Sequence, residues 1–308
     1  MDENKTYSRR RVLTTGGVAA GAGAVAGLAA GVALVQGGAP TPTITPSAAR
    51  RYAGKVVVVT GATSGIGRAA TVRFAAEGGK VGFCGRRENL GREVEREIRA
   101  AGGEAMYVRA DVRVESEVQR FVDRVASAYG GLDVCFNNAG ITNQKPLHEF
   151  TSGEWDDVIG TNLRGVFLSM KYQIPHLLRR GGGNIVITSS GNAKLSGTDR
   201  SAYAASKSGL VGLVQSASLD YAMQGIQINT VLPGTVNSEF TRRVGGAMDL
   251  PDAVWDAMAA NWGKSNVRGL RRMATPDEVA AFVLTMASAD FPYMTGSHLA
   301  IHGGNGTP

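Results

Sequence analysis

The run Val56–Thr60 consists of four valines and a threonine, and the pattern around it limits the folds open to this chain. An unbroken apolar run of β-branched residues is typical of a strand that is buried on both faces. A glycine-rich turn follows, then a segment with apolar residues at helical spacing, and the alternation repeats as far as Ile301. Strands that alternate with helices form a parallel sheet with right-handed crossovers on both faces. We therefore predict an α/β fold, a doubly wound, Rossmann-like parallel sheet in a single domain.

The same alternation places the individual elements. A helix is expected to begin at Thr275, because Thr275-Pro276-Asp277-Glu278 combines an N-cap threonine, a proline in the first turn and a glutamate that closes a capping box. Since no repeat, long linker or change of composition follows residue 50, residues 50–308 are expected to form one domain. Long helices are predicted at residues 153–179 and 202–223. Strands are predicted at residues 56–60, 81–84, 104–109, 133–136, 184–189, 226–232 and 297–301.

The first 49 residues differ in composition from the rest. Arg9, Arg10 and Arg11 precede a stretch from Val12 to Ala49 that holds no charged residue. A basic segment followed by a mildly apolar one is typical of an export signal, and the paired arginines resemble the twin-arginine type. We predict that residues 1–49 are a signal and linker, and that the protein is exported to an extracytoplasmic or periplasmic location. There are two alternatives. The signal could stay uncleaved and anchor the chain in a membrane, or the protein could belong to the bacterial cytoplasm.

Charge and composition narrow the classes of partner. With 43% hydrophobic and 19% charged residues, the chain is typical of neither a disordered nor a multi-span membrane protein. The net charge of +7 is spread over isolated basic pairs, without the basic stripe interleaved with aromatic residues that a nucleic-acid groove needs. No nucleic-acid partner is therefore expected. The four histidines have no ligand spacing, so no metal site is expected either.

The two cysteines, Cys84 and Cys135, fall on predicted strands that flank the first strand. Strands on either side of a common neighbour lie about 9–10 Å apart, beyond the reach of a disulfide. We expect two free, buried thiols.

The turn after the first predicted strand carries three glycines, in the sequence Thr60-Gly61-Ala62-Thr63-Ser64-Gly65-Ile66-Gly67. Glycines at this place let the backbone approach a pyrophosphate, whose charge rests on the N-terminus of the next helix. A plain turn would explain the glycines alone, but their place directly after a valine-rich strand favours a dinucleotide. Their spacing, Gly-x-x-x-Gly-x-Gly, differs from the common Gly-x-Gly-x-x-Gly.

A second set of residues has the chemistry for proton transfer. Tyr203 and Lys207 lie four residues apart on a predicted helix, and hence on one face. A nearby ammonium group stabilises a phenolate and lowers the pKa of a tyrosine from about 10. Ser190 ends a predicted strand 13 residues before Tyr203, where its hydroxyl can hold a substrate oxygen as charge develops on it. Taken singly, the pair could be a surface contact and Ser190 a turn residue.

With Asn137-Asn138-Ala139-Gly140 and Tyr203-x-x-x-Lys207, the glycine loop resembles the short-chain dehydrogenases/reductases over residues 53–304. The resemblance implies an NAD(P)-dependent oxidoreductase that transfers a hydride between a nicotinamide cofactor and a carbonyl compound or secondary alcohol. It also implies a catalytic tetrad. In this tetrad Tyr203 exchanges the proton, Ser190 polarises the oxygen, Lys207 tunes Tyr203 and binds the cofactor ribose, and Asn162 holds a water that relays protons to the lysine.

The resemblance places the cofactor contacts at the carboxyl ends of the strands. Gly85 stands where an acid would select NAD, and Arg86 after it predicts a contact with the 2′-phosphate of NADP. NAD is the alternative, with Arg86 and Arg87 as a solvated pair. The implied cofactor-binding residues are Gly61, Thr63, Ser64, Gly65, Ile66, Gly67, Arg86, Arg87, Asp111, Val112, Asn138, Ala139, Gly140, Tyr203, Lys207, Pro233, Gly234 and Val236.

A small-molecule carbonyl or alcohol is the expected partner, and the resemblance implies a homotetramer or homodimer. Residues 238–272, the least regular stretch, are predicted to cover the substrate. Trp255, Met258 and Trp262 give this stretch one apolar helix face, which fits an apolar substrate or internal packing equally well. The alternative function is a cofactor-binding protein without catalysis, such as a redox sensor or an assembly partner. The presence of both Tyr203 and Lys207 argues against it.

Overall fold

Parallel strands form the centre of the computed structural model, which describes residues 39–45 and 49–305. Seven of them form one sheet, in the order β3-β2-β1-β4-β5-β6-β7. The first strand, β1, therefore lies inside the sheet, with β2 and β3 on one side of it and β4 to β7 on the other. This order confirms the predicted doubly wound α/β fold. Most of the predicted signal, residues 1–49, lies outside the described residues.

Every predicted strand is present, and its ends differ from the prediction by one residue at most. The prediction succeeds because each strand is a short apolar run bounded by a turn. The strands are β1 (Val56–Thr60), β2 (Lys80–Gly85), β3 (Glu104–Arg109), β4 (Val134–Asn137), β5 (Gly183–Thr188), β6 (Ile226–Pro233) and β7 (His298–Ile301).

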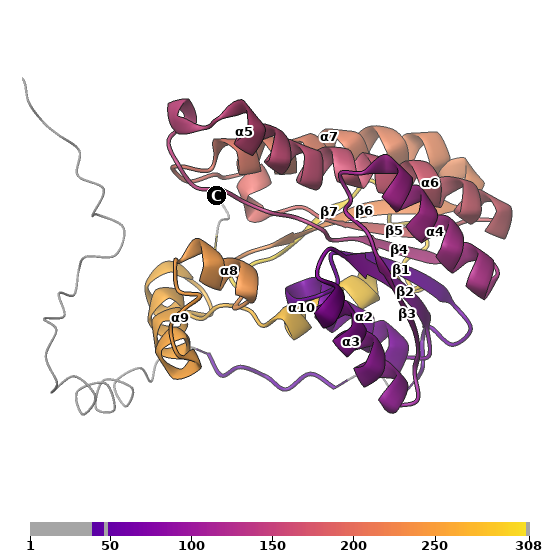
Figure 1. Cartoon of the computed structure of the whole chain (residues 1–308), viewed down its shortest axis with the longest axis horizontal. Helices are drawn as coiled ribbons and strands as arrows, with labels where there is room; N and C mark the ends of the chain where they lie inside the picture. The colour runs from indigo at the N-terminus through magenta and orange to yellow at the C-terminus, as the bar shows by residue number, and fades with distance from the viewer. Residues whose placement is uncertain (1–38, 46–48, 306–308) are drawn as a thin grey trace, which may run out of the picture. The chain divides into compact units, whose positions relative to one another are not determined.

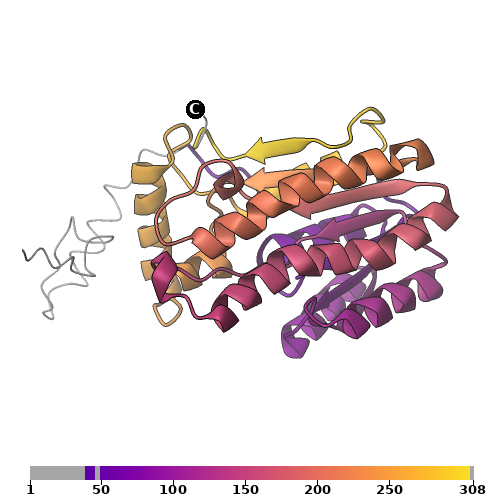
Figure 2. The same cartoon turned by 90° about the horizontal axis from the view of Figure 1, so that it is seen from above.

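Helices cover both faces of the sheet (Figure 1). Side chains alternate along a strand, so Val57 and Val59 of β1 pack against one helical layer and Val56 and Val58 against the other. This two-sided burial explains why β1 is apolar at successive positions. The first layer contains α2 (Gly65–Ala76), α3 (Glu88–Ala100) and α10 (Pro276–Met286). The second, seen from above in Figure 2, contains α4 (Glu115–Tyr129), α6 (Gly165–Arg180) and α7 (Ser201–Tyr221).

The helix predicted at residues 153–179 is interrupted. It consists of α5 (Ser152–Ile159), a π-helical turn (Gly160–Arg164) and α6. A π turn contains one more residue than an α turn and occurs mostly within helices at functional sites. Apolar spacing does not reveal it, because the helical stretch continues on both sides. The capping box at α10 is as predicted, since Thr275 and Glu278 make both of its hydrogen bonds.

Two short helices follow β6 and form the stretch predicted to cover the substrate. They are α8 (Glu239–Val244) and α9 (Asp252–Asn266). We refer to residues 238–272 as the lid. None of the helices described combines the length and apolar character needed to cross a bilayer. The apolar part of the predicted signal, residues 16–35, lies outside the described residues.

Cys84 and Cys135 are buried and free, as predicted. The strands that carry them, β2 and β4, both pair with β1 and therefore lie on either side of it. Burial raises the pKa of the Cys84 thiol to about 12. Both side chains behave as small apolar groups of the core.

Gly82 of β2 lies where α4 packs against the sheet, and a Cβ there would lie 2.2 Å from a methyl carbon of Val125. We expect Gly82→Ala to lower the free energy of unfolding by about 2 kcal/mol, since overpacking a core costs roughly 1–3 kcal/mol. Gly212 of α7 is the matched control, because no atom lies within 4 Å of a Cβ at that position. Gly212→Ala should raise the stability by up to about 1 kcal/mol through helix propensity. Urea unfolding measures both, and equal effects at the two positions would contradict the packing.

Candidate active site

The glycine loop between β1 and α2 is packed against the end of β4. Gly61 has a φ of +67°, and a Cβ there would lie 2.6 Å from the Cα of Ala139. The hydroxyl of Thr60 accepts hydrogen bonds from the backbone N–H groups of Asn138 and Ala139, at 3.1 and 3.2 Å. Only glycine fits this close approach, so the loop and the Asn138–Gly140 segment form one rigid unit.

The N-terminus of α2 opens directly from this loop. Ser64 is its N-cap residue but makes no side-chain capping bond, and the first turn holds no acidic residue. The first N–H groups of a helix have no partner within it, and the helix dipole adds positive potential there. Gly65, Ile66 and Gly67 form this first turn, so the loop fits the pyrophosphate of a dinucleotide.

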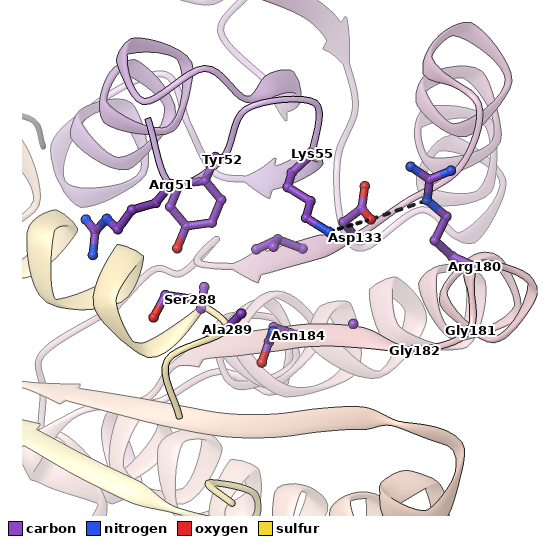
Figure 3. Close-up of a pocket in the computed structure, with 13 residues that line it drawn as sticks. Arg51, Tyr52, Lys55, Asp133, Arg180, Gly181, Gly182, Asn184, Ser288 and Ala289 are labelled. Atoms are coloured by element: carbon purple, nitrogen blue, oxygen red, sulfur yellow. Dashed lines mark hydrogen bonds and ion pairs between the residues drawn. The ribbon is translucent and has the colours of Figure 1, made fainter. Parts of the chain in front are cut away.

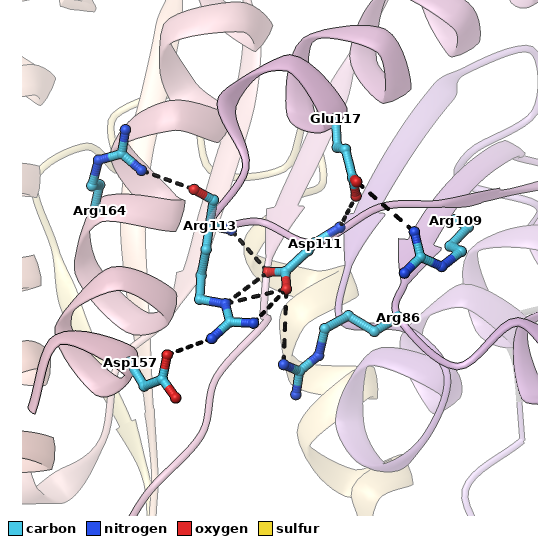
Figure 4. Close-up of polar contacts among 7 residues, drawn as sticks. All are labelled: Arg86, Arg109, Asp111, Arg113, Glu117, Asp157 and Arg164. Carbon is cyan, nitrogen blue, oxygen red and sulfur yellow. Dashed lines mark hydrogen bonds and ion pairs between the residues drawn. The ribbon is translucent and has the colours of Figure 1, made fainter. Parts of the chain in front are cut away.

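The ends of β2 and β3 carry a network of charged side chains, shown in Figure 4. Asp111 lies between two arginines: Arg113 donates to it at 2.7 Å, and Arg86 lies 3.8 Å away. Burial alone would raise the pKa of Asp111, but the hydrogen bonds from Arg113 outweigh it and hold that pKa below its usual value. Val112, the next residue, is buried. The Arg86 side chain is half exposed, so its guanidinium is accessible at this edge of the sheet.

Gly85, the last residue of β2, lies against the glycine loop. A Cβ there would lie 2.6 Å from a methyl carbon of Thr63. An acidic side chain at this position would therefore displace Thr63. The chain therefore has no carboxylate at the end of β2, where one would bind the ribose hydroxyls of NAD.

Arg87 connects three parts of the site. Its Nη2 donates to the hydroxyl of Ser64 at 2.6 Å, and its Nε donates to that of Thr63 at 3.2 Å. Its Nη1 lies 2.5 Å from a carboxylate oxygen of Glu239, the first residue of α8. The glycine loop, the end of β2 and the lid thus meet at one guanidinium.

The predicted catalytic pair lies on one face of α7. The Nζ of Lys207 is 5.7 Å from the centroid of the Tyr203 ring, and it donates a 2.7 Å hydrogen bond to the carbonyl of Thr188. The Ser190 hydroxyl accepts from the backbone N–H of Asn192 at 3.2 Å, and it lies close enough to the phenol of Tyr203 to lower the pKa of that group. The structure therefore brings Ser190, Tyr203 and Lys207 together at the end of β5.

The predicted lowering of the tyrosine pKa is wrong for the site as the structure shows it. Burial raises the pKa of Tyr203, and the opposing effects of the Ser190 hydroxyl and the charge of Arg200 are smaller. Burial also lowers the pKa of Lys207 to about 7. The Nζ of Lys207 contacts the Thr188 carbonyl and the Tyr203 ring, and only 3% of the residue's surface is exposed. Burial therefore disfavours the charged form of Lys207, which is the form that stabilises a phenolate.

Asn162 lies in the π turn and faces the same site. Its Oδ1 accepts from the backbone N–H of Ile141 at 2.8 Å, and its Nδ2 donates to the carbonyl of Ile141 and to the hydroxyl of Ser206. A Cβ on Gly140 would lie 3.4 Å from the Oδ1 of Asn162 and 3.5 Å from the Nζ of Lys207. Asn162 therefore holds the segment after β4 beside Lys207.

The segment after β6 closes the other side of the site. Gly234 donates its N–H to Ile301, and Val236 is buried and forms a bridge with Ala274. The distance from a Cβ on Gly65 to the Cβ of Ser238 would be 3.7 Å. Pro233, at the carboxyl end of β6, and the residues after it thus lie opposite the glycine loop.

The lid contributes apolar surface beside the phenol. The ring centroids of Phe240 and Tyr203 lie 6.2 Å apart, and Phe240 is partly exposed. Of the two roles considered for the apolar face of α9, internal packing applies to Trp255 and Trp262. Trp255 packs with Ala259 of the lid and with Met273 directly after it, and Trp262 lies against the same cluster.

Comparison with known proteins agrees with this geometry. A model of the short chain dehydrogenase family matches residues 55–248. The chain belongs to the short-chain dehydrogenase family. It is therefore an NAD(P)-dependent dehydrogenase or reductase.

The chain aligns with almost the whole length of similar members of the short-chain dehydrogenase family. The cis-4-hydroxycyclohexanecarboxylate dehydrogenase of Sinomonas cyclohexanicum is 39% identical over 254 residues, 82% of this chain and 97% of that protein. The 3-oxoacyl-[acyl-carrier-protein] reductase FabG of Staphylococcus epidermidis is 34% identical over 252 residues, 81% of this chain and 98% of that protein. The crystal structure of levodione reductase superposes with a TM-score of 0.75 at 32% identity, covering 82% of this chain and 98% of that one.

Three features of this short-chain dehydrogenase site are not predicted from the sequence. They are the ion pair between Arg87 and Glu239, the hydrogen bond from Asn162 to Ser206, and the hydrogen bond from Lys207 to the Thr188 carbonyl. Each joins residues far apart in the chain, and neither periodicity nor local spacing records such contacts. The place of Glu239 directly after Ser238, at the start of the lid, is the only signal for the first.

A hollow of about 440 Å³ lies at the opposite edge of the short-chain dehydrogenase fold, at the amino ends of β1, β4 and β5. Figure 3 shows Lys55 and Arg180 directed at Asp133, at 3.6 and 3.3 Å. The second carboxylate oxygen of Asp133 accepts from the N–H of Val56 at 2.8 Å. These contacts tie the strand ends together, and none of the predicted catalytic residues lies there. Among the described residues, no group of three or more His, Cys, Asp or Glu side chains could hold a metal ion.

Proposed function

We propose that the protein is an NADP-dependent oxidoreductase that interconverts a carbonyl compound and a secondary alcohol through Asn162, Ser190, Tyr203 and Lys207. The observation that carries the proposal is the meeting of the Tyr203 phenol, the Ser190 hydroxyl and the Lys207 amino group beside the glycine loop. A bound nicotinamide supplies or accepts the hydride.

The chain's own residues handle the oxygen and its proton. In the direction of reduction, the Ser190 hydroxyl donates a hydrogen bond to the substrate oxygen while the Tyr203 phenol gives that oxygen its proton. Lys207 supplies charge beside the phenol and offers its Nζ to a ribose hydroxyl. Asn162 keeps the chain after β4 in place around the lysine. In the direction of oxidation, the same phenol oxygen receives the proton.

The substrate that fits best has a carbonyl or hydroxyl carbon on a largely apolar body. Phe240 stands beside Tyr203 and is partly exposed, and the exposed apolar side chains of Leu195 and Met248 belong to the segments after β5 and in the lid. The relatives named for a hydroxycyclohexane carboxylate and for 3-oxoacyl groups support carbonyl and secondary alcohol substrates. NADPH oxidation with cyclic ketones and 3-oxoacyl thioesters tests the proposal, and no turnover with either nucleotide would overturn it.

NADP is proposed over NAD because β2 ends on Gly85 where an acid would select NAD, and the half-exposed Arg86 follows it. We expect Arg86→Ala to weaken NADPH binding about tenfold or more while changing NADH binding less than twofold, since charge-assisted bonds from arginine to phosphate are worth about 1.5–3 kcal/mol. Fluorescence titration with each nucleotide measures this. Equal losses for NADPH and NADH would contradict a contact with the 2′-phosphate. Arg109→Ala, at the end of the neighbouring strand, is the control for general loss of charge.

A further inference from the structure

The ion pair between Arg87 and Glu239 joins the lid to the glycine loop. Glu239 begins α8, and its carboxylate accepts from Arg87 at 2.5 Å and from Arg243 at 2.6 Å. Arg87 in turn holds the hydroxyls of Thr63 and Ser64 in the loop. Both partners are partly buried, with 38% and 27% of their side chains exposed. The lid therefore has a specific polar attachment beside the N-terminus of α2.

This carboxylate stands where an anionic ligand is expected. The bond from Arg87 is the largest of the effects that lower the pKa of Glu239, so the carboxylate is ionised at neutral pH. A phosphate group that takes a hydrogen bond from Arg87 or from the loop N–H groups would meet a negative charge only a few ångströms away. Like charges at such a distance repel even when partly screened. The three nitrogens of Arg87 already donate to Glu239, Ser64 and Thr63, so a phosphate that binds this guanidinium competes with these partners.

We propose that Glu239 and Arg87 form a latch that holds the lid on the glycine loop, and that the phosphate groups of the cofactor compete with Glu239 for Arg87. The latch rests on the proposed function, because the competing anion belongs to the cofactor. Glu239 acts on the affinity for the nucleotide and on lid position, and it takes no part in the chemistry. The exchange of partners couples arrival of the cofactor to release of α8.

The first test is nucleotide affinity in the full-length protein. Glu239→Gln removes the competing charge and keeps the shape, so NADPH should bind about fivefold more tightly, as expected from loss of a partly exposed ion pair. Arg87→Ala should weaken NADPH binding. In the Arg87→Ala background the Glu239→Gln change should not alter NADPH affinity further. The guanidinium for which Glu239 and the phosphate compete is absent from that protein. Fluorescence titration of the wild type, the two single variants and the double variant gives the four affinities of this double-mutant cycle. The cycle is measured once with NADPH and once with NADH.

Glu88→Gln is the matched control. Glu88 follows Arg87 in the chain, carries the same charge as Glu239 and pairs with Arg92 on α3. Its loss should change NADPH affinity by less than twofold. Tightening as large as that of Glu239→Gln would mean that total charge matters and would overturn the latch. A larger effect on NADPH than on NADH identifies the 2′-phosphate as the competitor, and equal effects identify the pyrophosphate; both support the latch.

The second test needs no nucleotide. Amide hydrogen exchange of residues 239–244 should be severalfold faster in Glu239→Gln than in the wild type, because α8 loses its attachment to the loop. Unchanged exchange and unchanged affinity in this variant, with a wild type that binds nucleotide, would overturn the latch alone. A wild type that binds neither NADPH nor NADH would overturn the proposed function as well.

Discussion

Tyr203→Phe is expected to lower kcat by about 10²–10⁴-fold, the range that general acid–base catalysis contributes, while the affinity for NADPH stays nearly the same. The substitution removes one oxygen and retains the ring that lies against Phe240 and near Lys207. Removal of the proton donor affects the transition state and not nucleotide binding. Steady-state kinetics and fluorescence titration on the same sample separate the two effects.

Tyr221→Phe provides the matched control on the same helix. Tyr221 ends α7, away from the catalytic side chains, and packs against the core. Its variant should keep wild-type turnover. If Tyr203→Phe also kept wild-type turnover, the phenol could not be the proton donor and another group would have to supply the proton.

Lys207→Met should have the second large effect. It should lower turnover and raise the stability of the folded state. Turnover should fall by about 10²-fold or more, because the charged group beside the phenol is lost. The folded state should become more stable at neutral pH, because burial of this amino group disfavours its charged form. The gain is reduced by loss of the hydrogen bond to the Thr188 carbonyl. Chemical denaturation at several pH values measures the stability.

The pH dependence of this gain follows from the lysine pKa, which is lowered to about 7 in the folded protein from an ordinary value of 10.5. Between these values the unfolded chain binds the proton and the folded protein does not. The free energy of unfolding of the wild type should therefore rise with pH across this window, by up to about 1.4 kcal/mol for each pH unit. The stability gain of Lys207→Met is largest below pH 7 and disappears as the pH approaches 10.5.

Lys171→Met is the control for this measurement. Lys171 is half exposed on α6 and is paired with Glu115, which raises its pKa. Its variant should show no gain in stability at low pH. A similar pH profile for Lys171→Met and Lys207→Met would contradict the burial penalty assigned to Lys207.

The fold could be predicted because local pattern and tertiary burial agree along the sheet. Val56–Thr60 is buried on both faces and the sequence shows it as one apolar run. Thr275 and Glu278 could be placed at a helix start because a capping box is made within four residues. The π turn around Asn162 could not, since an extra residue in a helical turn leaves the apolar pattern on either side intact.

The candidate site could be predicted as a set of positions but not as an electrostatic environment. The glycine loop, Ser190 and Tyr203 were found by spacing, and they meet at one edge of the sheet. The pKa of Tyr203 depends on how deeply the phenol is buried, which the sequence does not record. The partner of Arg87, Glu239, lies 152 residues further along the chain, so only the fold brings them together. Export through residues 1–49 stays a prediction from composition.

Transfer of deuterium from NADPH labelled at C4 tests most directly whether Tyr203 and the glycine loop serve hydride transfer. Mass spectrometry of the alcohol formed from a reducible ketone should show deuterium on the carbinol carbon with the wild type and no labelled alcohol above background with Tyr203→Phe. Nucleotide titration should show that both proteins bind NADPH. Alcohol that forms without the label, or labelled alcohol at equal rates from both proteins, would contradict the assignment.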